Sequence, residues 1–211
     1  MSDKLPACFT SQVVVLAIPN IDTDTIIPID YCVNRERPHF DEGLFRLWRF
    51  HDDGTENTDF ALNAPRFRNA EVLITGENFG CGSSREMAVW ALADFGIRAV
   101  IAPSFGEIFY NNCFQNNVLA ACLTQAQIDA IGHCAEINDT YEVSIDIDEK
   151  CLRAPGLPPY PFDLDGLRAE MLLKGLDPIE ATLTREAEIA AFEITDRAKR
   201  PWVNPRSSSS N

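Results

Sequence analysis

A loop rich in glycine and serine holds the residues best suited to chemistry. Residues 76–86 read Gly-Glu-Asn-Phe-Gly-Cys-Gly-Ser-Ser-Arg-Glu. Gly80 and Gly82 lack a Cβ, so the backbone there can approach a ligand closely. Arg85 can bind a carboxylate through two parallel hydrogen bonds, and Ser83 adds a hydroxyl at the same point. This combination indicates a binding site for a small anion.

The expected position of the loop favours the same chemistry. It follows a predicted strand over residues 71–75 and precedes a helix that we expect Ser83 to open, with Glu86 at the spacing of a capping box. The free N–H groups and the positive dipole at the start of a helix favour an anion. The hydroxyls of Ser83 and Ser84 serve there either as capping groups or as an activated oxygen.

Two phosphate-binding loops are excluded. No Gly-Lys-Ser or Gly-Lys-Thr follows, as a Walker loop requires, and the third glycine of the dinucleotide fingerprint is missing. A tight turn with a serine N-cap and a surface arginine at Arg85 explains the residues as well as an anion site does. Taken alone, the loop leaves both interpretations open.

An earlier polar segment offers a second candidate. Asp22 and Asp24 follow a predicted buried strand over residues 12–18. They form either an acid pair or the turn-forming side chains that Asx and Thr residues commonly provide. Arg37, further along the chain, is either an anion ligand or a solvated surface side chain.

Composition narrows the class of partner. The chain has 211 residues, with 18 Lys and Arg against 32 Asp and Glu, which gives a net charge of −14. A surface this acidic repels phosphate backbones and anionic lipid, so we expect neither nucleic acid nor a membrane as partner. The longest apolar runs, residues 13–18 and 118–123, are far shorter than the roughly 20 residues of a spanning helix.

The cysteines indicate a reducing compartment. There are seven, an odd number, and none lies three residues from another, so the chain has no CxxC pair for metal or redox chemistry. We therefore expect no metal on this chain, a cytoplasmic location, and thiols that act mainly as small core residues.

The hydrophobic pattern predicts an α/β fold, a single domain with a mainly parallel sheet flanked by helices. Short apolar runs alternate with helical periodicity, and this order is typical of a parallel sheet. Residues 141–152 alternate in polarity and predict a hairpin or an edge strand. Thr124 and Gln127 have the spacing of a capping box, and Gly96 is the expected C-terminal cap of the helix that follows the glycine-rich loop. The expected strands are 12–18, 71–75, 98–103 and 118–123, and the expected helices are 83–96, 105–113, 124–135, 163–174 and 184–197.

A long insertion interrupts this pattern early in the chain. Residues 30–65 show no clear periodicity, which is typical of a functional or mobile loop. The aromatic residues between positions 40 and 67 form either a local cluster or a patch for a partner. We expect the domain to span residues 1–200 and residues 201–211 to form a disordered tail.

The ordered series of motifs resembles the small subunits of 3-isopropylmalate dehydratase, the swivel domain of the aconitase superfamily. The resemblance covers nearly the whole chain apart from the tail, and its most specific block is Gly80 to Glu86. The other matching segments are 22–28, 44–45, 48–50, 77–79, 90–92, 100–105, 108–110, 175–177 and 182–183.

This resemblance implies a hydro-lyase that isomerises 2-isopropylmalate and 3-isopropylmalate in leucine biosynthesis, by dehydration and rehydration. It also implies a [4Fe–4S] cluster ligated by a separate large subunit, with this chain inactive on its own. The substrate is then a small diacid, and the partner is the cluster-binding large subunit.

The resemblance also implies roles for single residues. Ser83 matches the catalytic base, which would remove a carbon-bound proton while the substrate hydroxyl leaves to the cluster. Asp24 matches the active-site aspartate of the first loop, and Arg85 would hold a substrate carboxylate. The further substrate-binding candidates are Gly82, Ser84 and Arg37, the last in the loop that the family uses for side-chain recognition.

Two positions depart from the family pattern. Met87 stands where the family usually has His, and Val89 where it usually has Pro. A small subunit for another substituted malate, of the citraconate, 2-methylmalate or homoaconitate type, is therefore a second hypothesis. A third is a non-catalytic module that binds an anion at the same helix start.

Overall fold

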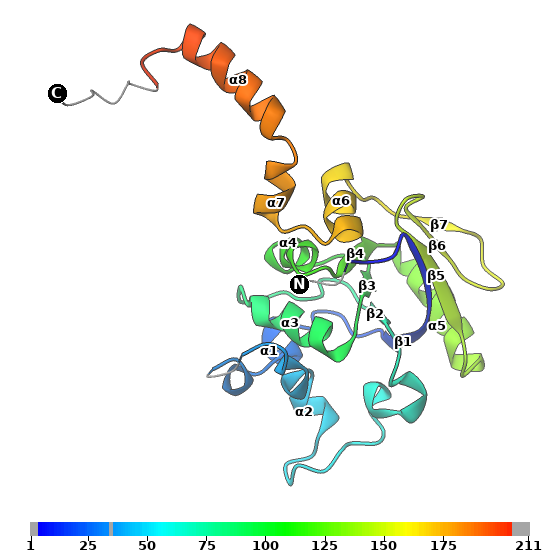
Figure 1. Ribbon diagram of the computed structural model, residues 1–211. Helices are drawn as coiled ribbons and strands as arrows, with labels where there is room; N and C mark the ends of the chain where they lie inside the picture. Colours follow the sequence, from blue (N-terminus) through cyan, green and yellow to red (C-terminus); the bar gives the residue numbers. More distant parts are fainter. Residues whose placement is uncertain (1–3, 34–35, 204–211) are drawn as a thin grey trace.

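The computed structural model describes residues 4–33 and 36–203. Its centre is a seven-stranded sheet in the order β4-β3-β2-β1-β5-β6-β7, which Figure 1 shows with helices on both sides. This arrangement confirms the predicted α/β fold. Most of the tail predicted over residues 201–211 lies outside the described residues.

One half of the sheet is parallel. β1 pairs with β2, β2 with β3 and β3 with β4, all in the same direction. All four predicted strands are therefore confirmed, with ends that shift by at most four residues. The bounds are β1 Cys8–Leu16, β2 Val72–Thr75, β3 Ala99–Ala102 and β4 Leu119–Cys122.

The other half of the sheet is antiparallel. β5 (Glu142–Asp146) and β6 (Cys151–Arg153) form the predicted hairpin, and β7 (Tyr160–Pro161) follows β6 at the edge. The alternative of an edge strand is wrong, because β5 lies between β1 and β6. β1 also begins earlier than predicted, because residues 8–12 pair with β5.

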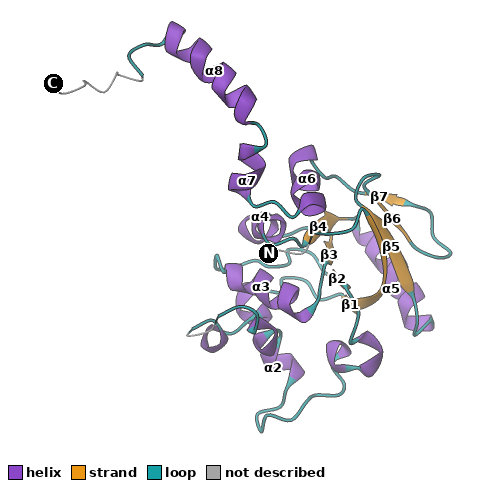
Figure 2. Ribbon diagram, viewed as in Figure 1, coloured by secondary structure: helices purple, strands orange, loops and turns teal. Residues whose placement is uncertain are grey.

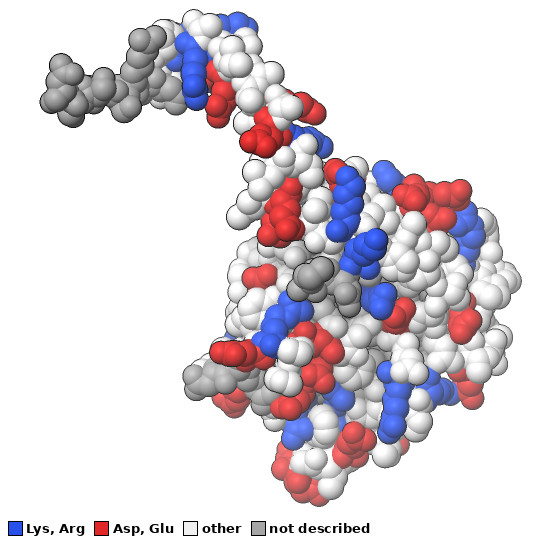
Figure 3. All heavy atoms as spheres, viewed as in Figure 1, with Lys and Arg blue, Asp and Glu red and all other residues white. Residues whose placement is uncertain are grey.

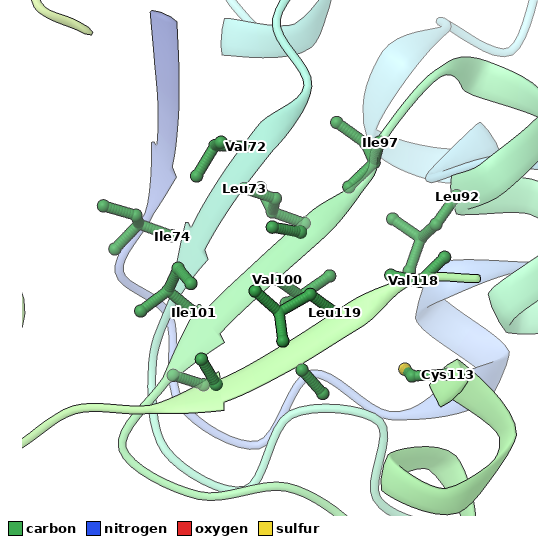
Figure 4. Close-up of a cluster of buried hydrophobic side chains, with 14 of the residues drawn as sticks. Val72, Leu73, Ile74, Leu92, Ile97, Val100, Ile101, Cys113, Val118 and Leu119 are labelled. Atoms are coloured by element: carbon green, nitrogen blue, oxygen red, sulfur yellow. The ribbon is translucent and has the colours of Figure 1, made fainter. Parts of the chain in front are cut away.

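The parallel strands form the centre of the core. The side chains of β2 and β3 are buried throughout. Strands covered on both faces need no alternation of polarity, which explains their continuous apolar sequences. Figure 4 shows Leu73 of β2 and Val100 of β3 in one buried cluster with Leu92 of α3 and Cys113 of α4.

Helices α3, α4, α5 and α6 lie beside this sheet, as Figure 2 shows. The predicted capping box of Thr124 and Gln127 is confirmed at the start of α5, and Gly96 ends α3 with a φ of 106°. Left-handed backbone of this kind favours glycine. The bounds are α3 Glu86–Phe95, α4 Glu107–Gln115, α5 Gln125–Ile137 and α6 Gly166–Lys174.

The predicted start of α3 is wrong. Ser83 does not open the helix, which begins at Glu86 after an extended Arg85. The Thr23 hydroxyl donates to the Ser83 carbonyl at 2.9 Å, and Gly82 has a φ of 88°. These features hold Ser83 in the loop against the first helix, α1 (Thr23–Ile26).

The helix predicted over residues 184–197 is confirmed as α8 (Glu186–Lys199). A further helix that was not predicted, α7 (Pro178–Leu183), precedes it. The capping box of Asp177 and Glu180, with Pro178 in the first turn, was the sequence signal for α7. α8 buries none of its side chains and extends away from the sheet in Figure 1.

The predicted insertion consists of short helices built around buried aromatic rings. Phe45 stacks on Trp48 with ring centroids 5.6 Å apart, and Phe40 meets the edge of Trp90 at 5.1 Å. The aromatic residues therefore form a local cluster. The helices are η1 Ile29–Tyr31, η2 Phe40–Gly43, α2 Arg46–Arg49, η3 Ala61–Asn63 and η4 Pro65–Phe67.

On the face drawn in Figure 3, acidic and basic side chains are interspersed instead of forming a continuous basic surface. None of the helices in the described part of the chain is both long and apolar enough to cross a lipid bilayer.

Asp94, near the end of α3, anchors the early segment. Its side chain is 5% exposed and accepts hydrogen bonds from the Arg37 guanidinium at 3.0 Å and from two backbone N–H groups. Those N–H groups belong to His39 and Phe40, at distances of 3.1 and 3.2 Å. The nearly buried carboxylate of Asp94 thus fixes the backbone at the start of η2.

Replacing Asp94 by Ala tests this anchor. We expect Asp94→Ala to lower the free energy of unfolding by about 2 kcal/mol, because it leaves a cation and two N–H groups without their acceptor. Urea denaturation measures the change. Asp148→Ala, at an exposed turn position, should stay within about 0.5 kcal/mol of the unmodified chain. Equal stability of the two variants would contradict the anchoring role.

Candidate functional site

Three strand-to-helix loops meet at the carboxyl ends of the parallel strands. Isolated bridges join Asp22 to Cys81 and Phe79 to Phe105, both parallel, so the loops after β1, β2 and β3 continue side by side beyond the sheet. They enclose a cavity of about 160 Å³. Its lining includes Thr23, Cys81, Gly82, Ser83, Arg85, Gly106 and Ile108.

Two glycines allow these loops to approach each other. Gly80 has a φ of 70°, and a Cβ there would overlap the ring of Phe109. A Cβ on Gly106 would lie 2.5 Å from the Gly80 carbonyl oxygen. Any larger residue at either position would push the second and third loops apart.

The start of α4 supplies backbone donors to the cavity. Tyr110 donates the first intrahelical hydrogen bond, to the Gly106 carbonyl at 2.9 Å. The N–H groups of residues 107–109 therefore have no acceptor within the helix. Such groups favour an anion. The sequence analysis expected this role at the start of α3 and missed α4. The available signal was Gly106, which follows the predicted strand over residues 98–103 and falls at the start of the helix predicted over residues 105–113.

Asp24 and Arg85 form an ion pair beside the cavity. The Arg85 side chain is 17% exposed and Asp24 is 54% exposed. Asp22 has a different task, because its carboxylate caps α1 by accepting from the Thr25 N–H at 2.7 Å. The alternative of an Asp22–Asp24 acid pair is therefore replaced by one capping and one ion-pairing residue.

The two serines differ in position. Ser83 lines the cavity with Gly82, whereas Ser84 lies next to it outside the lining. Both serines are exposed. The structure therefore brings together four predicted site residues, Asp24, Gly82, Ser83 and Arg85, with Ser84 adjacent to them.

Arg37 lies elsewhere. Its guanidinium pairs with Asp94, donates to the Asn116 side-chain oxygen at 3.3 Å and lies 5.7 Å from the Trp90 ring centroid. Asn116 in turn donates to the Glu86 carboxylate at 2.9 Å. The structure therefore does not bring Arg37 to the cavity but places it along one side of α3.

The two departures from the family pattern also lie away from the cavity lining. Val89 is fully buried, and Met87 packs against the core from a partly buried position. Neither contributes to the lining formed by the described residues. The structure thus gives no support to a changed substrate on account of these two side chains.

The site offers no metal centre of its own. Within residues 4–33 and 36–203, no group of three His, Cys, Asp or Glu side chains is placed to hold a metal ion. All seven cysteines are free thiols, and their burial ranges from exposed to fully buried. The donor set of this part of the chain therefore does not fit an iron–sulfur cluster.

Comparison with known proteins identifies the class of this fold and site. Residues 11–126 match the model of the aconitase C-terminal domain. The chain is 47% identical over 188 residues to proteins named 3-isopropylmalate dehydratase small subunit from Parvibaculum lavamentivorans and from Rhodopseudomonas palustris strain BisB18. Each match covers 89% of this chain and 94% of the relative. The chain belongs to the family of 3-isopropylmalate dehydratase small subunits.

A solved structure agrees with this assignment. The crystal structure of a 3-isopropylmalate dehydratase from Methanocaldococcus jannaschii superimposes with a TM-score of 0.64 at 26% identity. The match covers 87% of this chain and 98% of that one. The resemblance drawn from the motifs is therefore confirmed at the level of family and fold.

Gly106→Ala tests the close approach of the loops. The added methyl group collides with the Gly80 carbonyl, so we expect the free energy of unfolding to fall by about 1–3 kcal/mol. The matched control is Gly166→Ala in α6, where a Cβ meets nothing within 4 Å and stability should hold or rise slightly. Urea denaturation of both variants measures the difference, and a Gly106→Ala chain as stable as the control refutes the constraint.

Cys32 reports on the ion pair. Burial raises the pKa of its thiol, the charge of Arg85 lowers that pKa, and the charge of Asp24 raises it. We therefore expect Arg85→Met to move the pH midpoint of Cys32 alkylation upward and Asp24→Asn to move it downward, because the thiolate is the form that reacts. Peptide mass spectrometry over a pH series measures both midpoints. Shifts in the same direction would contradict the geometry.

Proposed function

We propose that this chain is the small subunit of a heteromeric hydro-lyase that interconverts 2-isopropylmalate and 3-isopropylmalate in leucine biosynthesis. One observation carries the proposal. Asp24 of α1 forms an ion pair with Arg85, beside a small cavity that Gly82, Ser83 and Arg85 line. The family assignment supports the same reaction.

Arg85 is proposed to bind a carboxylate of the diacid. Its guanidinium matches a carboxylate geometrically, and its low exposure reduces screening by water. Gly82 and Ser84 would place backbone and hydroxyl groups beside the bound substrate. The N–H groups at the start of α4 can receive a second carboxylate. Asp24 is proposed to act through Arg85, by holding the guanidinium in place.

Ser83 is proposed as the base that removes the carbon-bound proton. A serine hydroxyl is a weak base unless its alkoxide is stabilised, and fixed dipoles and cations provide that stabilisation in a site with little water. Arg85 and the start of α4 lie at the same cavity as Ser83. The proton would move to the serine oxygen, and the same group would return it during rehydration.

Arg37, expected from the sequence to bind substrate, is left out of these contacts. Asp94 and Asn116 already bind its guanidinium.

The proposal includes a large subunit. The [4Fe–4S] cluster that the family resemblance implies would assist departure of the substrate hydroxyl, and the described residues of this chain do not fit such a cluster. We therefore assign the cluster to the large subunit and expect this chain to be inactive alone. The names of the relatives, which call them small subunits, support a heteromeric assembly. A cytoplasmic location belongs to the same proposal.

The first experiment is an assay of the assembled complex. The chain is co-expressed with the large subunit of its own organism, and the anaerobic complex is assayed with isopropylmalate and with citraconate by following the enoate absorbance. Turnover of isopropylmalate well above citraconate supports the proposal. Preference for citraconate favours the related dehydratase instead. Turnover by this chain without a partner refutes the assignment of the cluster to a separate large subunit.

Ser83→Ala separates catalysis from anion binding. We expect kcat of the assembled complex to fall about 10²–10⁴-fold, because removal of a general base costs that much. Ser144→Ala, in β5 on the other side of the sheet, is the matched control and should leave kcat unchanged. If Ser83→Ala keeps full turnover, the serine is not the base, and an anion-binding role for the loop becomes the better explanation.

A further inference from the structure

A buried threonine of α1 binds the loop segment that carries Ser83. The Thr23 side chain is 1% exposed, although it belongs to the cavity lining. Its hydroxyl donates to the Ser83 carbonyl at 2.9 Å, and its backbone N–H donates to the Cys81 carbonyl at 3.0 Å. One residue of the first loop therefore binds the second loop on both sides of Gly82.

The backbone around Ser83 needs such a contact. Gly82, directly before the serine, has a φ of 88°, and glycine has a wide choice of backbone conformations. Ser83 itself belongs to neither a strand nor a helix, since α3 begins only at Glu86. The Thr23 hydroxyl thus supplies a constraint on Ser83 that regular secondary structure does not.

The same short helix also holds the guanidinium of Arg85. Asp24, the neighbour of Thr23 in the sequence, forms the ion pair with Arg85. α1 is itself fixed by Asp22, which accepts from the Thr25 N–H at 2.7 Å. Two adjacent residues of α1 thereby hold two groups of the site, the serine through its backbone and the arginine through its side chain.

We propose that Thr23 is a positioning residue for the base and sets where the Ser83 oxygen lies in the cavity. This inference rests on the proposed function. Because the hydrogen bond uses the Ser83 carbonyl, it fixes the residue without occupying the hydroxyl that takes the proton. A displacement of about 1 Å can lower the rate of an enzymatic reaction 100-fold.

The chain offers a matched control for the removal of a buried threonine hydroxyl. Thr75, at the end of β2, is fully buried, and in the described part of the chain its hydroxyl has no hydrogen-bond partner. Thr23→Val and Thr75→Val both replace a buried hydroxyl by a methyl group of similar size. Only the first of these two changes breaks a hydrogen bond to the loop.

The test measures turnover of isopropylmalate by the assembled, cluster-loaded complex. We expect Thr23→Val to lower kcat about 10- to 100-fold and to change KM by less than about threefold, because Arg85 still binds the substrate. Thr23→Ser keeps the hydroxyl and should stay within about threefold of the unmodified kcat. Thr75→Val should leave kcat unchanged.

A double variant separates positioning of the serine from a general structural role. If Thr23 acts through Ser83, adding Thr23→Val to Ser83→Ala lowers kcat no further, because the group that it positions is already gone. A double variant much slower than Ser83→Ala shows that Thr23 acts by another route and overturns the inference.

Folding and assembly of each variant are checked by circular dichroism and sedimentation. Thr23→Ala makes the same comparison if Thr23→Val does not assemble, and failure of both assigns Thr23 to folding and overturns the inference. An assembled Thr23→Val complex with unchanged kcat, or an equal loss in Thr75→Val, also overturns it. An unmodified complex that does not turn over isopropylmalate refutes the proposed function as well.

Discussion

The site depends on the close approach of three backbone segments beyond the ends of the parallel strands. Gly80 donates its N–H to the Ile21 carbonyl at 2.7 Å, and Gly106 donates to the Phe79 carbonyl at 2.9 Å. The second loop is thus held between the first and the third. The absence of a Cβ at Gly80 and Gly106 is what makes this distance attainable.

This arrangement makes the proposed anion site compatible with a chain whose net charge is −14. The local field depends on Arg85 and on the backbone dipoles of α4, which lie at the cavity. The repulsion from the many other acidic side chains is distributed over the surface and screened by salt. Asp24 partly neutralises Arg85 in the ion pair, and at 54% exposure it remains accessible to solvent.

The sequence predicted the elements that depend on local patterns. Buried strands, the capping box at Thr124 and the terminating Gly96 all follow from nearby residues, and all three are confirmed. The start of α3 could not be predicted in this way. Its local capping pattern is overridden by the hydrogen bond from Thr23, a residue sixty positions earlier in the chain. The role of α4 likewise depends on which loops become neighbours, and that follows from the strand order.

The early segment shows why a site residue cannot be assigned from its loop alone. Arg37 has the charge to bind a diacid, yet the nearly buried carboxylate of Asp94 takes its guanidinium. Asn116 accepts from Arg37 and donates to Glu86, the residue after Arg85. Contacts of the segment thus reach α3 at its last turn through Asp94 and at its first turn through Asn116. Because α3 begins directly after Arg85, the segment supports the cavity by fixing this helix and does not line it.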